Sequence, residues 1–297
     1  EICACLVGSE MCIRDSKYPN LYHTFIPDSA RYISHKKLGI TMGIKASRHE
    51  WLVFTEPDCR PQSNQWLKQM ARNFTPATEI VLGYSNYEKV PGWFNKKITF
   101  DTLLNSMRYL GMAVSGHPYM GTGRNMAYRK TLYYKQKGFA SHLNLQRGED
   151  DLFINETARA HNTRVEASPE SLMRIAMPKY KRIWCEEKIS YAATSRLFHG
   201  TARYLMGFET CSRFLFYTAI IATITISILL HQWTIAGIAV LLWSARFTMQ
   251  LIVFRKTAKV FGERKFCALL PLFDFLQPAW NLSLIHISEP TRHAQIS

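Results

Sequence analysis

Two long apolar stretches in the C-terminal part of the chain most constrain how it can fold. They run from Phe214 to Leu230 and from Thr234 to Phe254, and only His231, Gln232 and Trp233 separate them. Each is close to the roughly 20 apolar residues that an α-helix needs to cross a bilayer. We therefore predict a transmembrane hairpin, with two buried helices of a soluble protein as the alternative.

Positive charges lie at the outer ends of the expected hairpin. Arg213 precedes the first stretch, Arg255 and Lys256 follow the second, and the short connection contains no Lys or Arg. By the positive-inside rule, this asymmetry places the N-terminal part of the chain in the cytosol, at an inner or plasma membrane. Arg246 falls inside the second stretch, so we expect it to face a partner helix, to snorkel or to mark an interfacial helix. Residues 266–280 are expected to be interfacial or to begin a third span.

The two ends of the chain can be encoded by complementary DNA. Leu282–Arg292 can be written as a DNA stretch whose reverse complement, read one base along, encodes Leu6–Asp15. This relation is typical of a sequencing adapter read at both ends. We therefore expect residues 1–16 and 282–297 to be adapter-like and residues 17–281 to be a fragment of a longer protein.

The region before the hairpin predicts an α/β layer. Ser34–Ala46 has apolar residues at helical spacing, and Trp51–Thr55 is a continuous apolar run typical of a strand buried on both faces. Further helices are expected at 64–73, 100–114 and 150–160, and further strands at 79–84 and 126–128.

The first candidate site directly follows the expected strand Trp51–Thr55. Glu56 and Asp58 would lie at the C-terminal end of this strand, where open α/β sheets usually bind ligands. Two carboxylates one residue apart in a turn can both face a divalent cation such as Mg²⁺ or Mn²⁺, which prefers oxygen ligands and keeps substrate phosphates in its shell. The alternative is an ordinary acidic turn in which Asp58 caps the next helix or its lead-in.

The second candidate site is the acidic run Glu149, Asp150 and Asp151 at the start of an expected helix. A carboxylate here can accept a proton from an acceptor hydroxyl as a general base. Three adjacent acids repel one another, so one of them should have a raised pKa unless a metal or an Arg is near. The alternative is a solvated helix N-terminus.

A glycine-bracketed turn lies between the two acidic sites in the sequence. Gly123, Arg124 and Asn125 present a cation and an amide, which suits a phosphate or a sugar. A plain turn is the alternative.

Taken in order, these segments resemble the membrane-associated bacterial glycosyltransferases of family 2, which have the Rossmann-like GT-A fold. The run Lys36–Ala46, the following strand and Thr55–Pro61 (TEPDCRP) are similar to that family's Lys-rich helix and D-x-D metal motif, with Glu56 in place of the first Asp. Gly121–Arg129 (GTGRNMAYR) is similar to its acceptor-side segment, and Glu149-Asp150 to its catalytic E-D motif.

The resemblance implies a role for each matched residue. Asp58 and Glu56 would hold the divalent cation, and Asp150 would be the base, with Glu149 and Asp151 beside it. The residues implied for binding the nucleotide-sugar donor are Lys37, Gly123, Arg124 and Asn125. Residues 17–200 would form a partial GT-A catalytic domain, and residues 201–281 a basic interfacial segment with a truncated transmembrane hairpin.

The chain departs from the family pattern in two places. Too few residues precede Glu56 to supply the strand, helix and strand that hold the nucleoside, which predicts that the chain as given is inactive. The Q-x-x-R-W motif of processive members is also absent, and the nearest stretch is Trp184–Tyr191. A single sugar addition is therefore favoured over polymer synthesis.

The resemblance implies an inverting, metal-dependent, hexosyltransferase-like enzyme, and the charge pattern around the apolar stretches predicts that it acts at the cytosolic face of a membrane. Its acceptor would be a hydroxyl of a glycan or of a lipid-linked molecule. The formal net charge of +15 also suits nucleic acid, but the basic residues cluster beside the apolar stretches, so no nucleic-acid partner is expected. The alternative is a non-catalytic membrane protein whose α/β domain binds a phosphorylated ligand.

Overall fold

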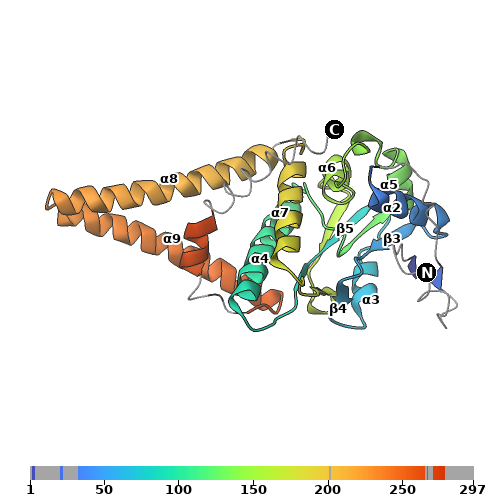
Figure 1. Cartoon of the computed structure of the whole chain (residues 1–297), viewed down its shortest axis with the longest axis horizontal. Helices are drawn as coiled ribbons and strands as arrows, with labels where there is room; N and C mark the ends of the chain where they lie inside the picture. Colours follow the sequence, from blue (N-terminus) through green and yellow to red (C-terminus); the bar gives the residue numbers. More distant parts are fainter. Residues whose placement is uncertain are drawn as a thin grey trace. The chain divides into compact units, whose positions relative to one another are not determined.

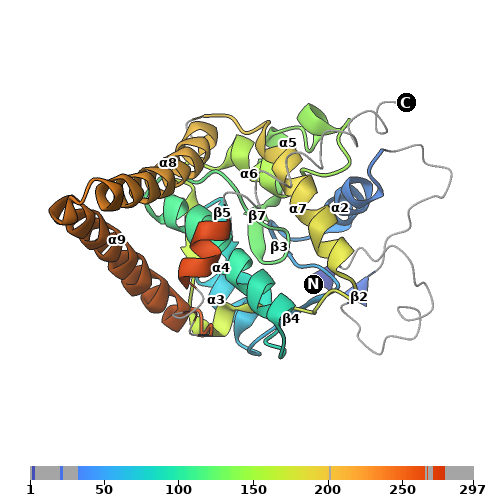
Figure 2. The same cartoon turned by 60° about the vertical axis from the view of Figure 1, so that its left-hand side comes forward.

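The computed structural model describes residues 2–3, 21–22, 33–200, 202–264, 266 and 270–277. The chain divides into two compact units (Figures 1 and 2). The first unit combines Glu1–Val90 with Leu104–Met177, and the second combines Pro91–Leu103 with Pro178–Ser297. Helix α4 (Trp93–Val114) contributes residues to both units.

The first unit contains a four-stranded mixed sheet in the order β3-β7-β5-β8. Its strands are β3 (Trp51–Phe54), β7 (Met126–Arg129), β5 (Ile80–Gly83) and β8 (Thr163–Glu166). Strand β7 is antiparallel to β3 and β5, whereas β5 and β8 are parallel. The expected α/β class is therefore confirmed.

The expectation that Trp51–Thr55 is buried on both faces is wrong. Strand β3 lies at an edge of the sheet, and within it only Leu52 is fully buried. The fully buried strand of this sheet is β5, whose four residues are all buried between two neighbouring strands. An apolar run alone does not distinguish an edge strand from a central one, because large side chains such as Trp51 can pack while remaining partly exposed.

Helices cover both faces of this sheet. On one face, Met70 of α3 (Trp66–Ala71) packs with Val81 and Ala127, and Trp51 stacks on Phe74 with ring centroids 4.0 Å apart. On the other face, Tyr128 packs against Phe153 of α6 (Asp151–Thr157), with centroids 4.8 Å apart. Neighbouring residues of β7 thus pack against opposite layers, as the two-residue period of a strand requires.

The remaining elements of the first unit are short, apart from α2. A second, three-stranded sheet has the order β4-β9-β6 and consists of β4 (Cys59–Pro61), β9 (Met173–Ile175) and β6 (Ser85–Tyr87). The other helical elements are α2 (His35–Ala46), α5 (Lys130–Lys135) and the 3₁₀ turns η1 (Ala140–His142) and η2 (Pro169–Ser171). Helix α2 begins after Ser34, whose hydroxyl accepts a hydrogen bond from the backbone N–H of Lys37 at 3.3 Å, as an N-cap does.

The second unit is helical. It contains α7 (Lys181–Ser195), α8 (Ala202–Leu229), α9 (Trp233–Val260) and a helical turn at 270–277. Residues Gly207–Leu229 and Trp233–Val260 are long and apolar enough to cross a membrane, and most of their side chains are exposed. In both views α8 and α9 meet at their connection and spread apart, and the helix 270–277 lies between them (Figures 1 and 2).

The helix 270–277 supplies the partner that the sequence led us to expect for Arg246. The carboxylate of Asp274 accepts hydrogen bonds from Arg246 Nη1 at 3.2 Å and from the Tyr217 hydroxyl at 2.5 Å. It also forms an ion pair with Arg213 Nη1 at 3.1 Å. One buried carboxylate thereby joins α8, α9 and the helix 270–277.

Most of both chain ends lies outside the described residues. Strand β1 (Ile2–Cys3) pairs in parallel with β2 (Leu21–Tyr22), and these four residues are the described part of residues 1–32. The expectation about adapter-like ends therefore falls mainly on residues outside the description, including all of 282–297.

Candidate functional site

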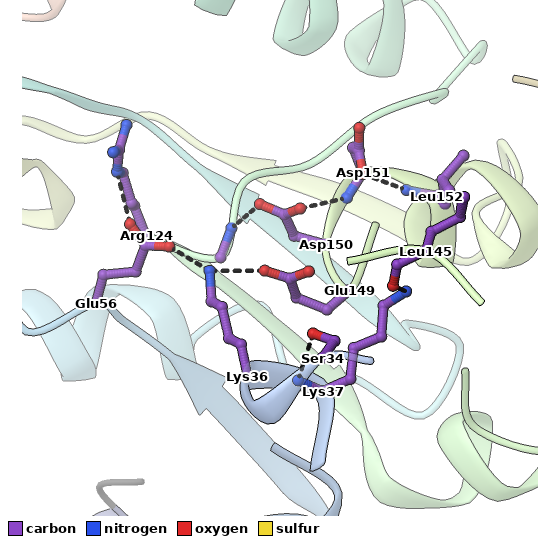
Figure 3. A network of polar contacts seen from close by, with 11 residues as sticks. Ser34, Lys36, Lys37, Glu56, Arg124, Leu145, Glu149, Asp150, Asp151 and Leu152 are labelled. Carbon is purple, nitrogen blue, oxygen red and sulfur yellow. Dashed lines mark hydrogen bonds and ion pairs between the residues drawn. The ribbon is translucent and has the colours of Figure 1, made fainter. Parts of the chain in front are cut away.

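Glu56 lies two residues after strand β3 and is held by two cations. Lys36 Nζ of α2 donates to Glu56 Oε1 at 2.6 Å, and Arg124 Nε donates to Oε2 at 2.9 Å (Figure 3). Burial alone would raise the pKa of Glu56, but Lys36 and Arg124 outweigh it and lower the pKa to about 2. Glu56 is therefore ionised, and each of its oxygens has a cationic partner.

Lys36 connects this carboxylate to the second acidic run. Its Nζ also lies 2.7 Å from Glu149 Oε1, so it stands between Glu56 and Glu149 (Figure 3). Burial acts to lower the pKa of Lys36, but the charges of Glu56, Glu149 and Asp150 raise it far above its usual range. Two acidic motifs that are far apart in the sequence are thereby bridged by one ammonium group.

The acidic run 149–151 is buried rather than solvated. Glu149, Asp150 and Asp151 are each at most 3% exposed, which excludes the alternative of an ordinary solvated helix N-terminus. Asp150 is the N-cap of α6: its Oδ1 accepts from the backbone N–H of Asp151 at 2.8 Å, and its Oδ2 from that of Gly123 at 2.9 Å. These two bonds fix the plane of the carboxylate.

The pKa of Asp150 is raised above its ordinary value. Burial is the largest cause and the charge of Glu149 the second, whereas Lys36 and the Gly123 N–H act in the opposite direction. The sequence predicted that one of the three adjacent acids would behave in this way. Glu149 Oε2 is also buried, and none of the described residues donates a hydrogen bond to it.

Lys37 occupies a different position from the one expected. Its side chain is buried, and Nζ donates to the carbonyl oxygens of His142 at 2.5 Å and Leu145 at 2.8 Å. Burial lowers its pKa to about 8, although Glu149 and Asp151 act to raise it. Lys37 therefore holds the loop before the acidic run, and Lys36 is the lysine that contacts the carboxylates.

The side chain of Asn125 also forms its hydrogen bonds within the protein. Its amide nitrogen donates to the carbonyls of Tyr84 at 2.8 Å and Ser171 at 2.9 Å, and its Oδ1 accepts from Trp66 Nε1 at 3.0 Å. A side chain with these three bonds stabilises the strands around it. In contrast, its neighbours Gly123 and Arg124 contact Asp150 and Glu56, and Arg124 also lies over the Tyr87 ring at 5.8 Å.

The expected metal motif brings its carboxylates together. Ligand atoms of Glu56, Asp58 and Cys59 all lie within 4.8 Å of one another. Asp58 is exposed and accepts a hydrogen bond from the Cys59 thiol at 3.4 Å. It does not cap the next helix, since the N-cap residue of α3 is Gln65. Burial and the charge of Asp58 raise the pKa of Cys59 far above its usual range, so the thiol stays protonated and the two carboxylates are the groups that could hold a cation.

The residue that sequence reasoning missed is Lys36. Adjacent helical residues point about 100° apart, so the pair Lys36-Lys37 requires one lysine to face a different direction from the other. Nothing in the local sequence indicates which of them contacts the acids. The contact depends on the position of residues 142–149, which is a tertiary property.

Comparison with known proteins gives little further constraint. No protein-family model and no curated protein matches the chain. Among solved structures, it is similar to the mannosyltransferase PcManGT from Pyrobaculum calidifontis in complex with GDP-Man and Mn²⁺. The sequence identity is 11%, the match covers 86% of this chain and 69% of that chain, and the TM-score is 0.43. A likeness of this degree carries no argument about function.

Proposed function

We propose that the chain is a divalent-cation-dependent glycosyltransferase of the family-2, GT-A type that moves a sugar from a nucleotide-diphosphate donor to a hydroxyl acceptor, with inversion. The observation that supports this most is the meeting of Glu56 and Glu149 on the single ammonium group of Lys36. This contact supports one site that contains both the motif proposed to bind the metal and the motif proposed to supply the base. Inversion follows from the family resemblance.

Glu56 and Asp58 fit a divalent cation. Both offer oxygen atoms after a strand end, and Asp58 is exposed and thus accessible to a metal bound to phosphate. Mg²⁺ and Mn²⁺ prefer such hard ligands and are usually bound by one or two carboxylates together with substrate phosphates. When bound, the cation would neutralise the diphosphate that leaves with the nucleoside.

Lys36 and Arg124 are the cations available to the donor diphosphate. Both now bond to Glu56, at 2.6 Å and 2.9 Å. If Glu56 turns toward a cation, these two groups can bond phosphate oxygens instead, because guanidinium and ammonium groups form charge-assisted hydrogen bonds with phosphate. This assignment places Lys36, in preference to Lys37, in the donor site.

Asp150 is the proposed base. The acceptor hydroxyl gives its proton to an Asp150 oxygen while the hydroxyl oxygen bonds to the anomeric carbon of the sugar. The bond from that carbon to the diphosphate oxygen breaks, and its electron pair leaves with the nucleoside diphosphate. A carboxylate with a raised pKa is better suited to accept this proton near neutral pH than an ordinary Asp.

The proposed location is the cytosolic face of an inner or plasma membrane. Helices α8 and α9 expose many large apolar side chains, including Phe208, Leu215, Leu241 and Met249, each more than 60% exposed. Exposed apolar surface of this extent suits a lipid environment. The acceptor would then be a glycan or a lipid-linked molecule at that membrane.

The test is release of nucleoside diphosphate from a panel of nucleotide sugars by a membrane-bound, full-length version of the protein, with Mg²⁺ or Mn²⁺. Asp150→Asn should reduce turnover by about 100- to 10,000-fold, because it removes the general base. Asp151→Asn, whose Oδ1 accepts from the Leu152 backbone N–H at 2.8 Å, should lose less.

Two outcomes would revise the assignment. A deeper loss in Asp151→Asn than in Asp150→Asn would place the base at Asp151. Tight binding of a nucleoside diphosphate without turnover of any donor would favour the non-catalytic alternative, a membrane protein whose α/β domain binds a phosphorylated ligand.

A further inference from the structure

The second unit contains a cavity of about 490 Å³ at the C-terminal end of α9. Apolar side chains form much of its wall: Leu251 and Phe254 from α9, and Phe266 and Leu270 from the segment that follows. A volume of this size falls within the roughly 300–1,000 Å³ of small-molecule sites. The cavity therefore has room for an apolar group larger than a few methyl groups.

Three cations also line this cavity. Arg255, Lys256 and Lys259 belong to the last two turns of α9, and all three are exposed. Among the described lining residues, Glu263 is the acidic one, so positive charge is in excess. The cavity combines an apolar wall with a basic opening, which is the chemistry of an anionic amphiphile.

The length of α9 places these cations at a specific depth. The helix has 28 residues and therefore rises about 42 Å, whereas a bilayer's hydrocarbon core is about 30 Å thick. If the helix begins at one surface of the core, its final residues extend into the headgroup layer of the other. Arg255, Lys256 and Lys259 lie in that final part, at the level of lipid phosphates.

We propose that this cavity is a binding site for an anionic glycerophospholipid of the cytosolic leaflet. The lipid phosphate bonds to Arg255, Lys256 and Lys259, and part of an acyl chain packs on Leu251 and Phe254. The site goes beyond the proposed sugar transfer and rests on the proposed membrane location. Basic pockets at the cytosolic ends of membrane helices have the charge and depth that anionic headgroups require.

Cations near a helix C-terminus are common without any ligand, because they complement the helix dipole. The chain offers a matched control for this effect. Lys45, Lys68 and Lys135 lie in the last turns of α2, α3 and α5, and all three are exposed. Replacing them removes the same charge from helix ends outside the cavity, because none of the three lines it.

The experiment titrates the detergent-purified protein with phosphatidylglycerol or phosphatidylcholine and counts retained lipids by native mass spectrometry. We expect retention of phosphatidylglycerol and not of phosphatidylcholine. The triple variant Arg255→Gln, Lys256→Gln, Lys259→Gln should weaken retention on the order of 100-fold, since each cation near an anionic headgroup contributes about five-fold. The triple variant Lys45→Gln, Lys68→Gln, Lys135→Gln should retain it unchanged.

A second variant tests the cavity without changing charge. Ala258 lines the cavity and is buried, so Ala258→Phe should fill the space and lower phosphatidylglycerol retention while all cations remain. Three results would each overturn the proposal. The first is equal retention of the two lipids, and the second is an equal loss of retention in the two triple variants. The third is competition by inorganic phosphate, combined with wild-type lipid retention in Ala258→Phe.

Two parallel measurements separate this proposal from those on which it rests. Flotation with pure phosphatidylcholine vesicles tests the membrane location, because it needs only the apolar surface of α8 and α9. Donor turnover tests the transferase. A full-length version that floats and turns over donor but shows no preference for phosphatidylglycerol contradicts the lipid site alone.

Discussion

At the residue scale, two neighbours of Asp150 shift its pKa in opposite directions, and this predicts opposite changes in the pH dependence of turnover. Lys36 lowers the pKa of this carboxyl and Glu149 raises it. Turnover should fall as the pH drops and the base becomes protonated. Lys36→Met removes the stabilising positive charge, so the acid limb of the kcat/KM profile should move to higher pH. Glu149→Gln removes a repelling charge, so the limb should move to lower pH.

The control for this prediction is Lys37→Met. Lys37 bonds two backbone carbonyls rather than the carboxylates. Its loss should lower the free energy of unfolding by about 1–3 kcal/mol for each carbonyl left unsatisfied, with a smaller shift of the pH limb. Movement of the limb in the same direction for Lys36→Met and Glu149→Gln would exclude Asp150 as the titrating base.

The same residues show where sequence reasoning ends. The two acidic runs could be singled out because metal binding and general-base chemistry need carboxylates at particular spacings after a strand and before a helix, and their roles stay predictions. The roles of Lys37 and Asn125 could not, because a side chain that binds a ligand and one that braces a loop carry the same polar groups. Only the tertiary contacts, such as Asn125 with Trp66, Tyr84 and Ser171, distinguish them.

At the element scale, Glu166 at the end of β8 forms hydrogen bonds that connect β8 to the residues after α3. It accepts from Arg72 Nε at 2.9 Å, Asn73 Nδ2 at 2.6 Å and the Ser168 backbone N–H at 2.8 Å. Burial would raise its pKa, but the bonds from Ser168, Asn73 and Arg72 outweigh it and lower the pKa below the ordinary 4.5.

This shift predicts an acid-sensitive contribution to stability. Because the folded-state pKa is depressed, the contribution is complete above pH 4.5 and is lost as the pH falls through the lower folded-state pKa. Glu166→Gln should lower the free energy of unfolding by about 1.5–3 kcal/mol near neutral pH and by less in acid. Thermal unfolding followed by circular dichroism measures this, with the exposed Glu170→Gln as control. A loss of the same size at all pH values would contradict the assignment.

A second element-scale prediction concerns Asp274, which neutralises two arginines of the long helices. Asp274→Asn leaves Arg213 and Arg246 without this buried partner and should destabilise the second unit by about 3–5 kcal/mol. Adding Arg246→Met should restore part of the lost stability, because one unpaired cation is then removed. Unfolding in detergent measures both variants. An additive further loss in the double variant would show that the Asp274–Arg246 pair does not stabilise the fold.

Some helices and strands could be predicted from the sequence, and others could not. Helix α2 and strands β5 and β7 could be recognised because their periodicity or apolar runs are local. The strands β4, β6, β8 and β9 were missed, since they have three or four residues and sequences such as SNY and TRVE, whose polar character carries no strand signal. Their pairing is fixed by partners distant in the sequence. Helix α4 begins at Trp93, earlier than its apolar pattern indicated.

At the scale of the whole molecule, composition and segment length predicted an α/β part at 17–200 and a helical part at 201–281. These domain limits stay a prediction. The apolar stretches do form two long helices, and their exposed apolar surface agrees with the hairpin inferred from length. The helix 270–277 contains Pro271 and Asp274, and the sequence left open whether this segment is interfacial or begins a third span. Its place becomes clear only from the arginines that it pairs.

The central claim is that the carboxylates after β3 and before α6 form one cation-dependent site for a nucleoside diphosphate. The most direct measurement is a titration of Mn²⁺ into the purified protein, with and without UDP or GDP, for the wild type, Asp58→Asn and the control Glu170→Gln. We predict Mn²⁺ binding that a nucleoside diphosphate strengthens, that Asp58→Asn abolishes and that Glu170→Gln preserves. Mn²⁺ binding that is indifferent to both diphosphates, or that Asp58→Asn leaves unchanged, would contradict it.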